Sequence, residues 1–188
     1  MSKEANEFFK KYKDGLLGGI NTSSLCRVVA FDHQTMKVDV VTLPDGDLIQ
    51  NVPVQAPQTG DFIIRVPYKP GNVGVIVFSK NQIDDVMMGG IGETSAREFS
   101  IDDAIFIGGI NLFNDVMGAD HGEDLIISKK DYSAKIVLTK DGDILLQPAA
   151  GKKLIIDSPG GVDIKGGDVI ITGGTITANG EDLTTDLT

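Results

Sequence analysis

Residues 135–183, which read KIVLTKDGDILLQPAAGKKLIIDSPGGVDIKGGDVIITGGTITANGEDL, decide the fold of this chain. Apolar residues come there in pairs two positions apart, and glycine-containing turns separate the pairs. The first members of successive pairs are 8, 10, 8, 7 and 7 residues apart, which predicts one short strand per repeat unit. The pairs are Ile136 with Leu138, Ile144 with Leu146, Leu154 with Ile156, Val162 with Ile164, Val169 with Ile171, and Ile176 with Ala178.

These repeat units are too short to enclose a core within one chain. Each unit offers two inward side chains, against an ordering entropy of roughly 1–2 kcal/mol per residue. A single chain of such units would also leave its strand edges unpaired. Three chains wound about one axis would pair those edges, so we expect an intertwined homotrimeric triple-stranded β-helix. The core of this trimer would contain the members of the six apolar pairs given above, with the exception of Ala178. An ordinary β-meander and a single-chain solenoid of three sheets remain alternatives.

The middle of the chain has the pattern of a small β-barrel. Strands are predicted at residues 25–31, 36–43, 48–54, 62–66 and 73–78, with one or two helical turns at 81–88. Pro53 places the third strand at an edge, because proline cannot donate to a strand ladder. Five short strands with one helical insertion indicate an OB-type Greek-key barrel over residues 20–118. A linker over 119–134 and the repeat region with the C-terminal end over 135–188 would follow.

A short helix is expected at residues 4–13, within an N-terminal segment that spans residues 1–19. Phe8, Phe9 and Tyr12 fall on one face of this helix, and Gly15, Gly18 and Gly19 should bring it to an end. A helix this short is marginal alone, so its aromatic face should dock on another surface. That surface is either the chain's own barrel or a partner protein.

Composition excludes several classes of function. The 188 residues carry a formal charge of -10, which disfavours nucleic acid as a partner. Cys26 is the single cysteine, and the two histidines, His33 and His121, are far apart, so disulfides and zinc fingers are not expected. No Ser/His/Asp set is apparent, and no cofactor or metal is expected. Neighbouring acidic residues, as at 84–85, 102–103 and 181–182, should be solvated surface.

Several runs resemble one family. They are NVPV at residues 51–54, GDF at 60–62, PYKPGNVGVIVFS at 67–79 and SIDDAIFIGG at 100–109. In this order, and with the glycine-punctuated repeats that follow, the chain resembles the central, membrane-piercing spike proteins of contractile phage tail baseplates. Two positions depart from the family's usual pattern, because Asn72 stands where aspartate is usual and Gly108 where proline is frequent.

The resemblance implies a mechanical function and no enzymatic activity. Spikes of this family are homotrimers on the tail axis, in the baseplate of a virion that assembles in the host cytoplasm. Their OB domains meet a hub protein, and their β-helix is driven through the host envelope when the sheath contracts. Phe8, Phe9 and Tyr12 are the expected hub contact in this chain.

The C-terminal end departs from the family in a way that affects metal binding. Spikes of the family usually end in Leu-x-Thr-His-x-His, whose histidines hold an iron ion. Here Asp186 and Thr188 stand in place of the histidines, so an iron site is not expected. Three possibilities remain for this end: a frayed terminus, a platform for a separate tip protein, or three Asp186 carboxylates around Ca²⁺ or Mg²⁺.

Two other functions are weighed against the spike. The first is an OB-fold ligand-binding module for a saccharide or nucleic acid, trimerised by a β stalk. Its surface would use basic residues of the barrel, of which Arg27, Lys37 and Arg65 are candidates. The second is an enzyme, such as a component of a cell-wall hydrolase, which would need a carboxylate pair assembled by the fold.

Overall fold

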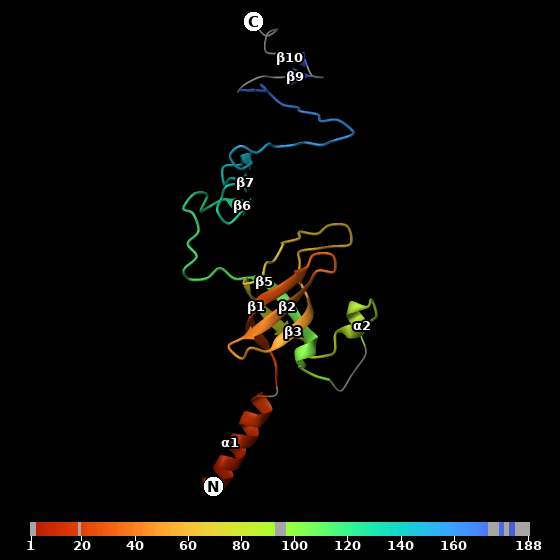
Figure 1. Cartoon of the computed structure of the whole chain (residues 1–188), viewed down its shortest axis with the longest axis vertical. Coiled ribbons are helices and arrows are strands. Elements are labelled where there is room, and N and C mark those ends of the chain that lie inside the picture. Colours follow the sequence, from red (N-terminus) through yellow and green to blue (C-terminus); the bar gives the residue numbers. More distant parts are fainter. Residues whose placement is uncertain (1–2, 19, 93–96, 173–176, 179–180, 183–188) are drawn as a thin grey trace. The chain divides into compact units, whose positions relative to one another are not determined.

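The chain is mostly β-structure with one longer helix at its N-terminal end (Figure 1), which confirms the expected class. The computed structural model describes residues 3–18, 20–92, 97–172, 177–178 and 181–182. It divides into two units, Met1–Val116 and Met117–Thr188. Each unit is described by itself below.

The N-terminal helix α1 spans Lys3–Gly18 and is longer than predicted. The prediction placed the helix at residues 4–13 with Gly15, Gly18 and Gly19 ending it, but a single glycine inside a helix costs only about 1 kcal/mol relative to alanine. The helix therefore continues through Gly15 to Gly18.

Five strands build the barrel of the first unit. They are β1 (Ser23–Asp32), β2 (Lys37–Leu43), β3 (Leu48–Pro53), β4 (Val73–Phe78) and β5 (Ala104–Gly109). The hydrogen-bonded order is β3-β2-β1-β4-β5, with antiparallel neighbours throughout. Strands β1 to β4 confirm four of the five predicted strands, and Pro53 does lie on the edge strand β3.

The remaining predicted strand, at residues 62–66, is wrong. Within this stretch Ile63 forms only an isolated bridge with Gln58, while the fifth strand of the sheet is β5 at Ala104–Gly109. An apolar run gives a segment strand propensity but does not decide which edge it pairs with. Here β4 pairs with β5, whose Ala104 and Phe106 alternate into the core.

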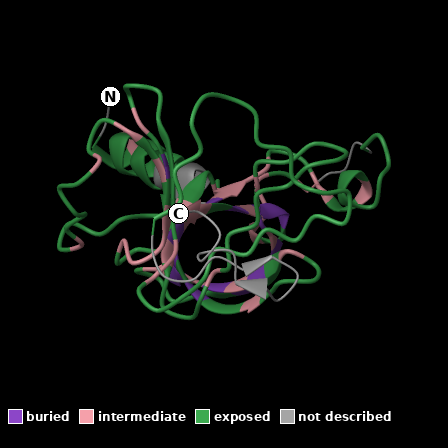
Figure 2. Ribbon diagram, turned by 90° about the horizontal axis from the view of Figure 1, so that it is seen from above, coloured by how far each residue is buried: buried purple, intermediate pink, exposed green. Residues whose placement is uncertain are grey.

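The sheet closes because β3 and β5 meet. Val54 and Phe106 form a parallel bridge, and the Gln55 N–H donates to the Phe106 carbonyl at 2.9 Å. The buried residues lie on the inside of the resulting barrel (Figure 2). Phe106 is 0% exposed and meets Tyr68 edge-on, with ring centroids 5.0 Å apart. The core residues are Cys26, Val28, Val38, Val40, Ile49, Val52, Val54, Ile76, Ala104 and Phe106.

An insert with little regular structure separates β4 from β5. It contains the helix α2 (Asp84–Met87), inside the helical turns predicted at residues 81–88, and a 3-10 helix at Ile101–Asp103. The Ser100 hydroxyl caps the second of these by accepting from the Asp102 N–H at 3.3 Å.

The second unit begins with an antiparallel sheet of three strands. They are β6 (Leu125–Ser128), β7 (Lys135–Leu138) and β8 (Ile144–Gln147), in the order β6-β7-β8. Strand β6 lies inside the stretch that we expected to be a linker. Strands β7 and β8 are the first two repeat units, and in a single chain they pair as a meander, one of the alternatives left open by the sequence.

The later repeat units form no strands over residues 152–172 of the single chain. Farther on, β9 (Thr177–Ala178) and β10 (Glu181–Asp182) pair antiparallel. Ile176, Asp186 and Thr188 lie outside the described residues, so the expectations for the core residue Ile176 and for the tip stay predictions.

Candidate assembly surfaces

One face of the β6-β7-β8 sheet is made of aliphatic side chains. Residues paired directly across antiparallel strands project to the same side, and alternate residues of a strand share a face. The register pairs Ile136 with both Ile127 and Leu146, and Leu138 with both Leu125 and Ile144. We call the resulting set the aliphatic face; its members, 46 to 70% exposed, are Leu125, Ile127, Ile136, Leu138, Ile144 and Leu146.

On the opposite face of the same sheet the central residue is buried, while its cross-strand neighbour Leu145 is 38% exposed. Val137, which alternates with Ile136 and Leu138, is 0% exposed. Burying a large aliphatic side chain contributes about 1.5–3 kcal/mol relative to leaving it exposed. The aliphatic face forgoes this stabilisation in one chain, and exposed apolar patches of this kind mark interaction sites.

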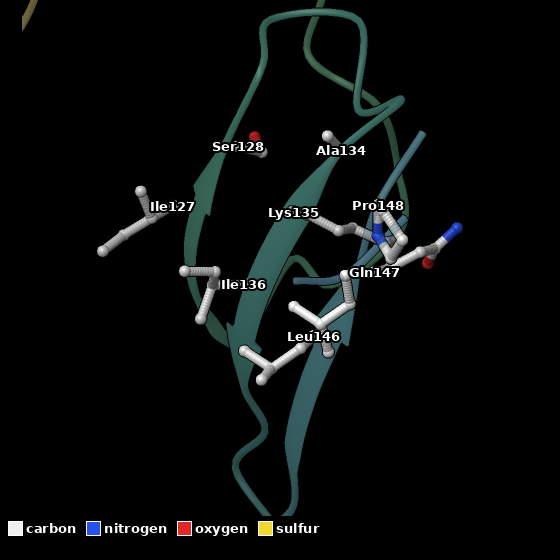
Figure 3. Close-up of a pocket in the computed structure, with 9 residues that line it drawn as sticks. Ile127, Ser128, Ala134, Lys135, Ile136, Leu146, Gln147 and Pro148 are labelled. Atoms are coloured by element: carbon white, nitrogen blue, oxygen red, sulfur yellow. The ribbon is translucent and has the colours of Figure 1, made fainter. Parts of the chain in front are cut away.

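The chain that follows β8 extends this surface. Ile136, Leu146 and Leu154 line one open hollow of about 270 Å³, and they are predicted core residues of three successive repeat units. Figure 3 shows Ile127, Ile136 and Leu146 on neighbouring strands, with Pro148 beside Gln147 at the end of β8. The structure thus brings the first three repeat units of the predicted core to a common surface.

The other described members of the predicted core are exposed as well. They are Ile156, Val162, Ile164, Val169 and Ile171. Ile155 has the opposite parity to Leu154 and Ile156, and it is 77% exposed against 64% for Ile156. A single chain therefore covers neither side of this segment, so the side that faces other chains is not decided within it.

The helix α1 presents the predicted hub contact as one aromatic cluster. The rings of Phe8 and Tyr12 stack with centroids 6.2 Å apart, and those of Phe8 and Phe9 meet edge-on at 5.7 Å. All three side chains are exposed. The spacing in the sequence thus places them together, while their partner stays a prediction.

A buried carboxylate holds the insert on the barrel, and here the sequence analysis was wrong. Asp103 was expected to be solvated, yet its side chain is 0% exposed. Arg97 donates from Nη2 to Oδ1 at 2.6 Å and from Nε to Oδ2 at 2.8 Å, and the Ile83 N–H donates at 3.0 Å. The same Nη2 reaches Asp84 Oδ2 at 2.9 Å. No local sequence motif predicts this arrangement, because only the fold brings Ile83, Arg97 and Asp103 together.

The electrostatics of Asp103 follow from these contacts. Burial favours the neutral acid, but the hydrogen bonds from Arg97 and the Ile83 N–H outweigh that effect. The pKa of Asp103 is therefore lowered below its ordinary value of 3.8. The carboxylate is charged at neutral pH and anchors both ends of the insert to the start of β5.

The barrel's basic residues do not form a common binding surface around an anion. Arg27 donates to the Gly71 carbonyl, and Arg65 donates to the carbonyl of His33. Lys37 lines a small pocket of about 170 Å³ together with Asp32 and Asp39, whose carboxylates repel a phosphate. These contacts give little support to the alternative that the barrel binds a saccharide or nucleic acid.

Two further observations concern chemistry and membranes. Among the residues that the structure describes, no three His, Cys, Asp or Glu side chains gather where a metal ion could be held. His121 is paired through Nδ1 with Asp124 Oδ2 at 2.8 Å, and the other carboxylate oxygen accepts from the Lys140 N–H. Within the described part of the chain, no helix is long and apolar enough to cross a bilayer.

Comparison with known proteins finds a similarity over the barrel. Residues 23–109 match a family described as the phage protein Gp138 N-terminal domain. The match begins at the first residue of β1 and ends at the last residue of β5, so it covers the whole barrel. No curated protein matches the chain. This similarity supports a phage structural role and association with the virion.

Proposed function

We propose that this protein is the central spike of a contractile phage tail baseplate, and that it pierces the host envelope mechanically. The observation that carries the proposal is the aliphatic face and the exposed repeat units that continue it, in a chain whose barrel resembles a phage protein domain. Such a chain needs copies of itself to cover its apolar residues.

The barrel supports the proposal through its topology. Its strand order, with β1 between β2 and β4 and a parallel contact between β3 and β5, supports our assignment of a five-stranded Greek-key barrel of OB type. We assign the OB domain to residues 20–118, as the resemblance to tail spikes implies. The barrel end, with the N-terminal segment 1–19, would meet the baseplate hub through Phe8, Phe9 and Tyr12.

The repeat region supports the proposal through what it leaves uncovered. In a homotrimer, the paired aliphatic side chains within residues 135–188 would face a shared axis. The strand edges of each chain would pair with those of the neighbouring chains. Burial of these side chains in threefold copies would hold the rod together. This function would require no enzymatic reaction, because strand pairing between the chains would carry the mechanical force along the threefold axis. The C-terminal end would meet the envelope directly or through a separate tip protein.

The first experiment measures mass in solution by light scattering after size exclusion. The full chain should have a mass of 3 × 20.0 kDa, or 60 kDa. Ile156→Asp should dissociate or unfold the rod, because it buries three carboxylates on the axis. Its matched control is Ile155→Asp, one position away, whose side chain would point outward in the proposed triple-stranded β-helix. A monomeric wild-type chain, or equal effects of the two variants, would count against the proposal.

Function is tested by complementation of a phage whose spike gene is disrupted. Wild-type protein and the Ile155→Asp variant should restore infectious particles, whereas Ile156→Asp should not. Tails that infect equally well with the Ile156→Asp protein would refute a mechanical role for the rod.

A further inference from the structure

The barrel unit carries an apolar hairpin that belongs to none of the surfaces above. The chain doubles back at residues 57–64, where the Thr59 N–H donates to the Phe62 carbonyl at 2.8 Å and the Ile64 N–H to the Pro57 carbonyl at 2.9 Å. Three consecutive apolar side chains, Phe62, Ile63 and Ile64, are exposed on it. We call this segment the Phe62 hairpin.

The same unit carries a partly apolar hollow on the insert between β4 and β5. A cavity of about 450 Å³ has an apolar wall of Ile83, Val86, Met87 and Ile91 on the insert and Ile105 on β5, and the polar residues Ser79, Asn81 and Gln82 line the rest together with Gly92. Figure 1 shows the insert helix α2 beside the barrel. We call this hollow the insert groove.

The insert groove is preformed, because polar contacts hold its walls. The buried Asp103 accepts from Ile83 on one wall of the groove, and Arg97 ties it to Asp84 at the start of α2. Farther along the insert, the Gly92 N–H donates to Asp85 Oδ2 at 2.8 Å. The groove therefore does not need to be ordered by whatever occupies it, which lowers the cost of binding.

Threefold symmetry requires two such patches. In a cyclic trimer each subunit meets the next through two different surfaces, because identical patches face each other only across a twofold axis. The barrel offers a protruding apolar segment and a partly apolar hollow. Their charges are also complementary: residues 55–69 hold Arg65, Lys69 and Asp61, a net of 2 - 1 = +1, while the insert at residues 79–103 holds two basic and six acidic residues, a net of 2 - 6 = -4 that includes the pairing of Arg97 with Asp84.

We infer that the Phe62 hairpin of one copy occupies the insert groove of the next copy, so that three barrels close a ring. This inference rests on the proposed homotrimer but adds an interface that the rod does not supply. The ring would fix the three barrels in one orientation and present a threefold face to the hub.

The test is crosslinking of the full chain with two introduced cysteines, Phe62→Cys and Met87→Cys. A short bis-maleimide should convert the double variant to covalent trimer on a denaturing gel. Either single variant should give none, because the contact joins unlike positions. The wild-type chain is a further control, since its one thiol, Cys26, is buried in the core.

The outcomes separate this inference from the proposed function. A 60 kDa particle (3 × 20.0 kDa) whose double variant yields no covalent dimer or trimer would overturn the barrel contact and leave the spike proposal standing. Crosslinking of either single variant would also overturn it, because like positions would then be in contact. A wild-type chain that is monomeric by light scattering would overturn the spike proposal itself.

Discussion

Phe106→Ala should destabilise the barrel by about 4 kcal/mol, within the range of about 3–5 kcal/mol measured for such truncations in cores. The side chain is 0% exposed, and its ring lies between the Tyr68 ring and the backbone of Gly74. The variant loses the transfer free energy of the ring and its edge-on aromatic contact, worth about 0.5–1.5 kcal/mol. Since Gly74 has no side chain that could move into the cavity, we expect little relief from collapse.

The assay is urea unfolding of the full chain at one fixed protein concentration, because an oligomer's apparent stability depends on concentration. With a slope of about 2 kcal/mol per molar urea, the midpoint should fall by about 2 M. Amide hydrogen exchange in β1 to β5 localises the effect to the barrel. The control is Phe113→Ala, whose side chain is fully exposed in the same unit and should change stability by less than about 0.5 kcal/mol. A loss below about 1 kcal/mol for Phe106→Ala would refute its place at the centre of the core.

Three further predictions concern the barrel. Gly74→Ala should lower the melting temperature, because a Cβ there would collide with the Phe106 ring; Gly60→Ala, which adds its methyl in open space, should not. Burial raises the pKa of the Cys26 thiol to about 11, so a thiol reagent at pH 8 should label it only after unfolding; rapid labelling of the folded chain would contradict this. Asp103 has its pKa lowered, burial being outweighed by the neighbouring guanidinium, so its stabilisation is present at neutral pH and lost as pH falls below 3.8. Acid titrations of stability should show a smaller loss for Asp103→Asn than for the wild type, and equal losses would exclude the carboxylate as a cause.

The barrel could be predicted in large part because its strands alternate. Val38 and Val40 face inward along β2 with polar or half-buried residues between them, which is a local and periodic signal. The choice between residues 62–66 and 104–109 as the fifth strand was not local. Both segments are apolar, and only pairing with β4 and closure against β3 select the second.

The candidate surfaces divide in the same way. The paired aliphatic residues and the aromatic stripe of α1 are periodic, so their positions were readable without coordinates. The Asp103 anchor was missed because adjacent acidic residues are normally solvated, and its partner Arg97 comes from an irregular stretch. The insert groove and the Phe62 hairpin were missed too, since a hollow forms only where separate segments meet.

The amino-acid sequence by itself determined the β class, the four strands β1 to β4, the glycine-punctuated repeat and the acidic balance, because periodicity, turn residues and charge act over short distances. The tertiary structure alone decided that β5 closes the barrel, that a charged Asp103 is buried, and that one face of the β6-β7-β8 sheet stays uncovered. Those outcomes depend on contacts between segments far apart in the chain. Strand pairing, desolvation and packing decide such contacts, and local secondary-structure preference does not.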